Sequence, residues 1–111
     1  MKRFVSIKKE RDLKKILSQG KKIKISDLTI IYLEKTSDPT NRFVFLVGKK
    51  FSRKASKRNL IKRRLRAIFS QIKIKIKGVD LVIMVRSSLA EKSFAELKLL
   101  IESILQKAGL I

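Results

Sequence analysis

The segment from Lys49 to Arg66 carries the side chains best suited to bind phosphate groups. It reads KKFSRKASKRNLIKRRLR, with ten Lys or Arg among eighteen residues and no acid. Five of the chain's nine Arg lie here, and the planar guanidinium matches phosphate geometry and stacks on bases. A merely solvated charged face, which is the alternative, would normally mix both signs. The segment therefore predicts a binding site for a polyanion.

The charge of the whole chain supports this prediction. It contains 29 Lys and Arg against nine Asp and Glu, a formal net charge of +20. Between Pro39 and Val79 there are fourteen basic residues and no acidic one. Self-repulsion at this charge destabilises the compact state, so a polyanionic partner is the simplest explanation. Nucleic acid fits best, and an anionic membrane surface is the rival.

The inventory of reactive side chains excludes several kinds of chemistry. The chain has no His and no Cys, which removes His-based acid–base catalysis, cysteine nucleophiles, disulfides and thiolate zinc sites. We predict no catalytic and no metal-binding side chain. No apolar run approaches the roughly 20 residues that span a bilayer, and no signal peptide is evident after Met1. We therefore expect a soluble cytoplasmic protein without a membrane partner.

The first half of the chain predicts one helix and three strands within a single domain, residues 1–111. Lys8–Gln19 has apolar residues at i, i+3 and i+4 and ends before Gly20, as an amphipathic helix does. The expected strands are Lys22–Ile25, Leu28–Glu34 and Phe43–Gly48. We expect the last two strands to form a hairpin across a turn at residues 37–41.

A helix from about Ser56 to Gln71 must position the basic residues. Its apolar side chains recur at i, i+4, i+7 and i+11, which is a core-facing stripe. At 100° per residue the opposite face is polar and basic. The helix is therefore expected to be anchored on one side and basic on the other. The stripe is Ile61, Leu65, Ile68 and Ile72, and the opposite face is Asn59, Lys62, Arg63 and Arg66.

The rest of the chain predicts a strand and a helix. Residues 72–77 are ambiguous between a last helical turn and an extended segment, and Val79–Val85 is expected to be a buried strand. Ser93 and Glu96 form the capping box of a final helix that ends near Gly109. This order predicts a two-layer α/β sandwich with a small sheet. The expected core face of the final helix is Phe94, Leu97, Ile101, Ile104 and Leu105.

Lys49-Lys50 and the run from Lys57 to Arg66 resemble the Arg-Asn-Arg signature region of the bacterial ribonuclease P protein subunit. The flanks resemble it too, at Leu13 to Gly20, at Tyr32, at residues 78–82 and at residues 93–96, so the resemblance covers most of the chain. It implies an α-β-β-β-α-β-α fold with a left-handed βαβ crossover. It also implies a complex with a catalytic RNA that removes the 5′ leader of precursor tRNA.

The resemblance implies the partners and the site residues. The RNA subunit, not protein side chains, would cleave, and Mg²⁺ would be held mainly by that RNA and the substrate. The sheet face beside the central helix would form a cleft for the leader. The implied RNA-binding residues are Lys49, Lys50, Arg53, Lys54, Lys57, Arg58, Asn59, Lys62, Arg63 and Arg66; the implied leader-binding residues are Leu13, Leu17, Tyr32 and Phe45.

The chain departs from the family pattern at three places. Leu60 replaces the third residue of the signature, Arg, so one expected RNA contact is missing. Ser52 stands where relatives often have glycine or another small residue. Leu13 and Leu17 stand where Phe is frequent, which would weaken any stacking on leader bases.

Several alternatives stay open. Asn59 could bind RNA or cap the helix, and Tyr32, Phe43 and Phe45 could be strand residues of the core. A ribosomal or other structural RNA-binding protein would also be small and basic. A free-standing metal-dependent nuclease would need clustered carboxylates, which the acid-free stretch does not offer.

Overall fold

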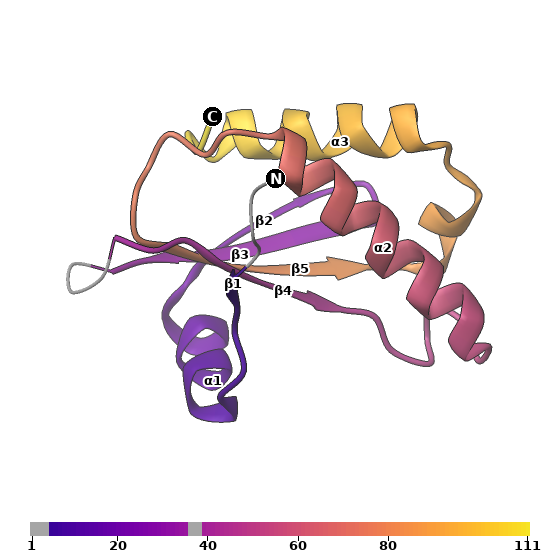
Figure 1. The fold of residues 1–111 in the computed structure, drawn as a ribbon, viewed down its shortest axis with the longest axis horizontal. Coiled ribbons are helices and arrows are strands. Elements are labelled where there is room, and N and C mark those ends of the chain that lie inside the picture. Colours follow the sequence, from indigo (N-terminus) through magenta and orange to yellow (C-terminus); the bar gives the residue numbers. More distant parts are fainter. Residues whose placement is uncertain (1–4, 36–38) are drawn as a thin grey trace.

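A computed structural model describes residues 5–35 and 39–111, which form one mixed sheet with helices on both faces (Figure 1). The sheet order is β1-β4-β5-β3-β2. The parallel neighbours β4 and β5 are joined through helix α2, and β3 runs antiparallel to both β2 and β5. The predicted fold class and the predicted α-β-β-β-α-β-α order are confirmed, and the short elements β1 and η1 were not predicted. The elements are β1 (Val5–Ser6), α1 (Glu10–Gln19), β2 (Lys21–Ile25), β3 (Leu28–Glu34), β4 (Arg42–Leu46), α2 (Ala55–Gln71), β5 (Val79–Val85), the 3-10 helix η1 (Ser87–Glu91) and α3 (Phe94–Lys107).

The predicted hairpin of β3 with β4 is wrong. Strand β5 lies between them and pairs with both. Six of the seven residues of β5 are buried, and an apolar strand of this kind is most stable in the centre of a sheet, covered on both faces. The hairpin is formed by β2 and β3 instead, and its turn places Ser26 at φ 55°. The predicted turn at residues 37–41 lies partly outside the described residues.

Helices α2 and α3 cover one face of the sheet and α1 covers part of the other (Figure 1). The predicted stripe of α2 is confirmed, because all four of its residues are buried against the sheet and α3. The capping box of α3 is also present, and four residues of its predicted core face are fully buried. Phe94 is the exception, at 37% exposed. A helical side chain points toward the N-terminus, so this first residue projects past the packed part of α3.

Helix α1 begins at Glu10, two residues later than predicted, and packs on the sheet through Ile16. It ends where predicted, at Gly20, whose N–H donates to the carbonyl of Ile16. A Cβ at Gly20 would lie 2.5 Å from that carbonyl oxygen and 2.8 Å from Cγ2 of Ile31. The φ of Gly20, −72°, is one that any residue adopts. Glycine is required here because a side chain would not fit between the helix end and the sheet.

The remaining boundaries differ little from the predictions. Residues 72–77, left ambiguous by the sequence, form neither helix nor strand. Strands β3 and β5 have the predicted bounds, whereas β2 and β4 each begin one residue earlier and β4 ends at Leu46, two residues earlier. No helix in the described part of the chain is long and apolar enough to cross a membrane.

Candidate nucleic-acid interface

The side of α2 that faces away from the core is a basic surface. Burial of its apolar stripe leaves Asn59, Arg63 and Arg66 exposed and Lys62 half-buried. The helix contains no acidic residue, and its N-terminus adds the partial positive charge of free backbone N–H groups. We call Asn59, Lys62, Arg63 and Arg66 the basic face of α2. It presents cations and donors with no carboxylate beside them on the helix.

The basic loop before α2 is tied to the helix. Phe51 is buried, and its N–H donates to the carbonyl of Gly48 at 3.0 Å. The hydroxyl of Ser52 accepts from the N–H of Lys54 at 3.1 Å, and Nη1 of Arg58 donates to the carbonyl of Ser52 at 2.8 Å. Arg58 therefore holds the loop through one N–H group, and its guanidinium carries further donors. The remaining predicted RNA-binding residues of the loop and first turn are exposed: Lys49, Lys50, Arg53, Lys54 and Lys57.

A groove of about 610 Å³ lies next to this loop, at the edge of the sheet face that α1 leaves open. Its floor includes Thr29, Leu46 and Met84, which are register neighbours on three adjacent strands. Lys22, Lys24, Met84 and Arg86 also line the groove and were not among the predicted site residues. Alternation in KKIKI would have placed the two Lys on one face of β2. The basic residues that line this lysine-rimmed groove are Lys22, Lys24, Lys49, Lys50 and Arg86.

The four predicted leader-binding residues do not lie together. Leu13 packs on the α1 side of the sheet, and Leu17 on the same helix is 43% exposed. Tyr32 is buried on the other side, where its hydroxyl donates to the carbonyl of Ala108 at 3.5 Å. Phe45 is also on that side, with its ring centroid 5.7 Å from that of Phe69. Among the described residues, α2 and α3 pack on the sheet face beside α2, so these four side chains do not line one cleft there.

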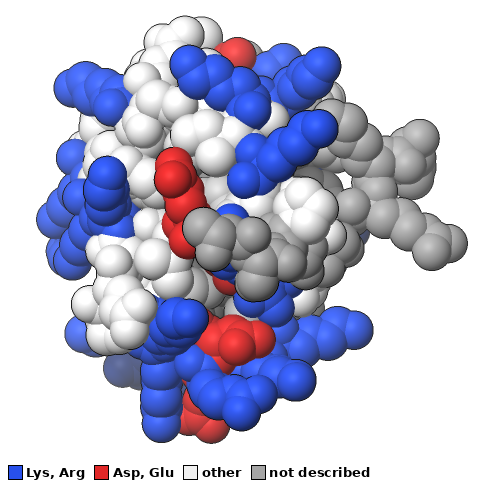
Figure 2. Space-filling model, turned by 90° about the vertical axis from the view of Figure 1, so that its left-hand side faces the viewer, with Lys and Arg blue, Asp and Glu red and all other residues white. Residues whose placement is uncertain are grey.

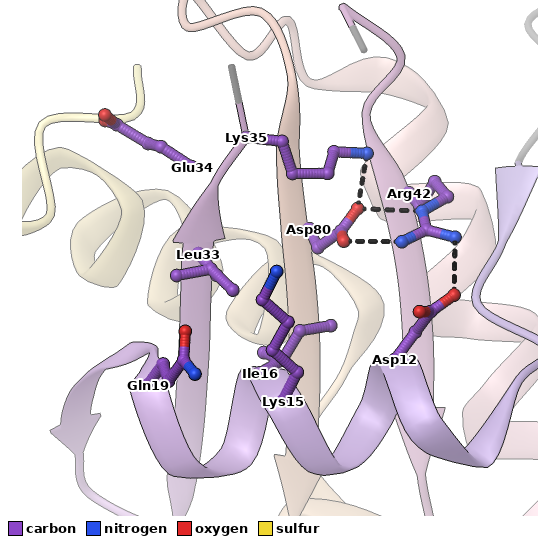
Figure 3. Close-up of a pocket in the computed structure, with 9 residues that line it drawn as sticks. All are labelled: Asp12, Lys15, Ile16, Gln19, Leu33, Glu34, Lys35, Arg42 and Asp80. Atoms are coloured by element: carbon purple, nitrogen blue, oxygen red, sulfur yellow. Dashed lines mark hydrogen bonds and ion pairs between the residues drawn. The ribbon is translucent and has the colours of Figure 1, made fainter. Parts of the chain in front are cut away.

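A network of ion pairs joins α1 to the centre of the sheet, beside a cavity of about 360 Å³ (Figure 3). Asp80 on β5 is 3% exposed. Its carboxylate accepts from Nε and Nη2 of Arg42, at 2.9 and 2.7 Å, and lies 2.8 Å from Nζ of Lys35. Nη1 of Arg42 also donates to Asp12 on α1 at 3.2 Å. One arginine therefore links strands β4 and β5 to α1.

The network perturbs both partners in the expected direction. Burial alone would raise the pKa of Asp80, but the hydrogen bonds from Arg42 and Lys35 outweigh it and hold that pKa below its usual range. The hydrogen bond to Asp80 raises the pKa of Arg42. Both side chains are therefore charged at neutral pH. The carboxylate of Asp80 is bound by Arg42 and Lys35, and Arg42 also binds Asp12 on α1. The network therefore fixes α1 on the sheet.

Positive charge is not confined to the basic segment. Figure 2 shows the end of the molecule on the left of Figure 1, where Lys and Arg side chains surround a few acidic ones. Among the residues outside the segment, Lys73, Lys75 and Lys77 are exposed in the irregular stretch after α2. A long polyanion could therefore follow more than one face of the molecule, with α2 as the most regular array of charges.

The comparisons with known proteins decide the family. The family model described as Ribonuclease P matches residues 1–109. This chain belongs to the ribonuclease P protein family. It is 32% identical over 111 residues to the ribonuclease P protein component of Ureaplasma parvum serovar 3, covering 96% of this chain and 97% of that protein. It is 33% identical over 110 residues to that of Geobacillus kaustophilus, covering 98% and 90%.

Solved structures of the ribonuclease P family have the same fold. The RNase P protein of Staphylococcus aureus superposes with a TM-score of 0.86 at 23% identity, covering 97% of this chain and 98% of that one. At this identity the likeness concerns the fold alone. The RNase P protein from Thermotoga maritima has a TM-score of 0.78 at 26% identity, covering 91% and 96%.

Membership of the ribonuclease P family makes the chain a component of an endoribonuclease that processes tRNA, with an RNA partner in a ribonucleoprotein. It favours this reading over a ribosomal protein or a free-standing nuclease. Among the described residues no group of three or more His, Cys, Asp and Glu could hold a metal ion.

Proposed function

We propose that this chain binds the catalytic RNA of ribonuclease P through the basic face of α2 and the 5′ leader of precursor tRNA through the lysine-rimmed groove. The observation that carries the proposal is the build of α2, which is buried on one side and presents Asn59, Lys62, Arg63 and Arg66 on the other. A helix fixed in this way holds its cations at set spacings. It can therefore match the phosphates of a folded RNA, whereas a disordered basic tail would first have to be ordered.

Cleavage of the phosphodiester is assigned to the RNA. With no His and no Cys, the protein lacks the usual groups for proton transfer near neutral pH. Phosphates of the RNA subunit and the substrate are suited to hold Mg²⁺, which would supply the activated water. The contribution of the protein is electrostatic. Its basic face lowers the repulsion between two polyanions and so reduces the Mg²⁺ concentration that their association requires.

The groove suits a single-stranded leader. Met84 and Leu46 offer an apolar floor for bases, and the basic rim offers partners for phosphates. Leader contacts made only by the precursor would raise its affinity over that of mature tRNA. Leu13 and Leu17 remain proposed leader contacts because they lie on the α1 side. Tyr32 and Phe45, also predicted to bind the leader, face the core on the other side.

Paired substitutions test the RNA-binding face. Lys62→Ala with Arg66→Ala should weaken binding to ribonuclease P RNA and reduce the slope of log K against log salt by about 0.7–0.9 for each lost phosphate contact. The matched control is Lys8→Ala with Lys107→Ala, which removes the same charge from exposed positions off the basic face. Affinity would be measured by filter binding from low to moderate salt. Equal losses in both double variants would contradict a specific face on α2.

A further inference from the structure

A second hollow lies on the flank of α2, between that helix and η1. It has a volume of about 360 Å³, within the size range of small-ligand sites. Its walls include Leu60 and Ile61 of α2, Ala90 of η1 and the buried Phe51. Leu60 is 40% exposed, so an apolar side chain opens to solvent within the most basic helix of the chain. We call this feature the α2–η1 hollow.

The rim of the hollow combines two cations with one carboxylate. Lys57 and Arg64 come from α2, and Glu91 ends η1. Among the described residues Glu91 has neither a salt bridge nor a side-chain hydrogen bond. An unpaired carboxylate beside two cations on a polyanion-binding surface would repel phosphate. It is suited to accept hydrogen bonds from a neutral donor group instead.

These features fit an unpaired nucleobase. The guanidinium of Arg64 and the side chain of Leu60 can cover the faces of a flat ring. Two carboxylate oxygens match two adjacent N–H donors. Guanine is the RNA base with two such donors side by side on its Watson–Crick edge, N1–H and the N2 amino group. Adenine and cytosine each offer a single amino donor there beside an acceptor, and uracil flanks its one donor with acceptors.

The hollow adjoins the proposed leader groove. Phe51 and Ser87 line both, so the two sites lie on either side of these residues. A strand whose phosphates follow Lys49 and Lys50 along the groove can therefore turn one base toward Leu60. The charge around both sites matches RNA, and the apolar walls match a base rather than a phosphate.

We propose that the α2–η1 hollow binds an unpaired guanine of the bound RNA, with Glu91 accepting from its Watson–Crick edge and Leu60 and Arg64 packing on the ring. The proposal rests on RNA binding beside α2 and adds a base preference at a defined place. It gives Leu60 a role: where the family signature has Arg, this chain has an apolar contact to a base. Specificity would then come from the hollow, whereas the basic face contributes affinity without regard to sequence.

The test uses short fluorescent oligouridines that carry one central guanosine, inosine or adenosine, or none, with binding measured by anisotropy at constant salt. The wild-type chain should prefer the guanosine oligomer to oligouridine by about fivefold or more, as expected for a bidentate base contact. Inosine, which keeps N1–H and lacks the amino group, should fall between. Adenosine should bind as weakly as uridine.

Two variants separate the base contact from general charge. Glu91→Gln should abolish most of the guanosine preference, whereas Glu34→Gln, at an exposed carboxylate on β3, should leave it unchanged. Leu60→Arg should tighten oligouridine binding and reduce the preference. A wild-type chain that binds all four oligomers equally, or a Glu91→Gln variant that keeps the preference, would overturn the proposal that the hollow binds guanine. Either result would leave the proposed function intact. No binding to any oligomer, together with no binding to ribonuclease P RNA, would overturn both.

Discussion

Replacing Arg42 with Met should destabilise the fold more than any loss of a surface charge. The variant keeps an unbranched side chain, although a shorter one, and removes the guanidinium that donates two hydrogen bonds to Asp80. Removal of one member of a buried ion pair costs about 3–5 kcal/mol, because the other charge stays buried. Lys35 remains 2.8 Å from the same carboxylate. We therefore expect the lower end, about 3 kcal/mol of unfolding free energy.

Urea unfolding followed by far-UV circular dichroism at pH 7 would measure this loss, since urea leaves the ionic strength unchanged. The matched control is Glu10→Gln, which breaks the exposed pair with Lys14 at 3.6 Å. An exposed i,i+4 pair contributes only about 0.3–0.5 kcal/mol. A loss below about 1 kcal/mol for Arg42→Met would refute the view that Arg42 compensates a buried charge.

The pH dependence gives a second measurement on the same pair. The pKa of Asp80 is lowered in the folded state, so its stabilisation is present above the unfolded pKa of about 3.9 and is lost as the pH falls through the folded pKa. In Arg42→Met burial remains while the main hydrogen bonds are gone, so the folded pKa should rise. The difference in unfolding free energy between wild type and variant should therefore become smaller as the pH falls from about 5 to about 2. A difference in unfolding free energy that does not change with pH would contradict the view that Arg42 lowers the pKa of Asp80.

Three further substitutions test how the fold positions the interface, all by urea unfolding. Leu65→Ala should cost about 2–5 kcal/mol, because Leu65 is fully buried beneath the basic face; a neutral result would mean that α2 is wrongly phased. Ser93→Ala should cost about 1 kcal/mol through loss of the capping box, and retention of full stability would argue against that cap. Gly20→Ala should cost about 1–3 kcal/mol through the 2.5 Å approach to the carbonyl of Ile16, and an unchanged midpoint would show that this helix end can shift.

The sequence was sufficient for elements whose signal is local. The stripe of α2 and the capping box at Ser93 depend on residues a few positions apart, and both are confirmed. The predicted pairing of β3 with β4 is wrong, because strands that follow one another in the sequence need not be neighbours in the sheet. Strand β5 takes the central position because it is apolar on both faces. Which strand lies in the centre depends on a comparison of all the strands, and short sequence patterns do not contain it.

The candidate site shows the same division. The basic face of α2 followed from helical periodicity, whereas the groove is built from β2, β3, β4 and β5 together. Side-chain type suggested Tyr32 as a leader contact, yet its strand position turns it toward Ala108 and the core. The pairing of Arg42 with Asp80 spans 38 residues, and no spacing rule connects them. Such contacts depend on the register of β4 with β5.

The central claim is that the chain assists an RNA enzyme, and reconstitution tests it most directly. Purified protein would be mixed with a bacterial ribonuclease P RNA and a 5′-labelled precursor tRNA at a Mg²⁺ concentration where the RNA alone is nearly inactive. The account predicts that the wild-type chain restores removal of the leader, that Lys62→Ala with Arg66→Ala restores less, and that protein without RNA cleaves nothing. Absence of any rescue by a folded wild-type chain, or cleavage by the protein alone, would contradict it.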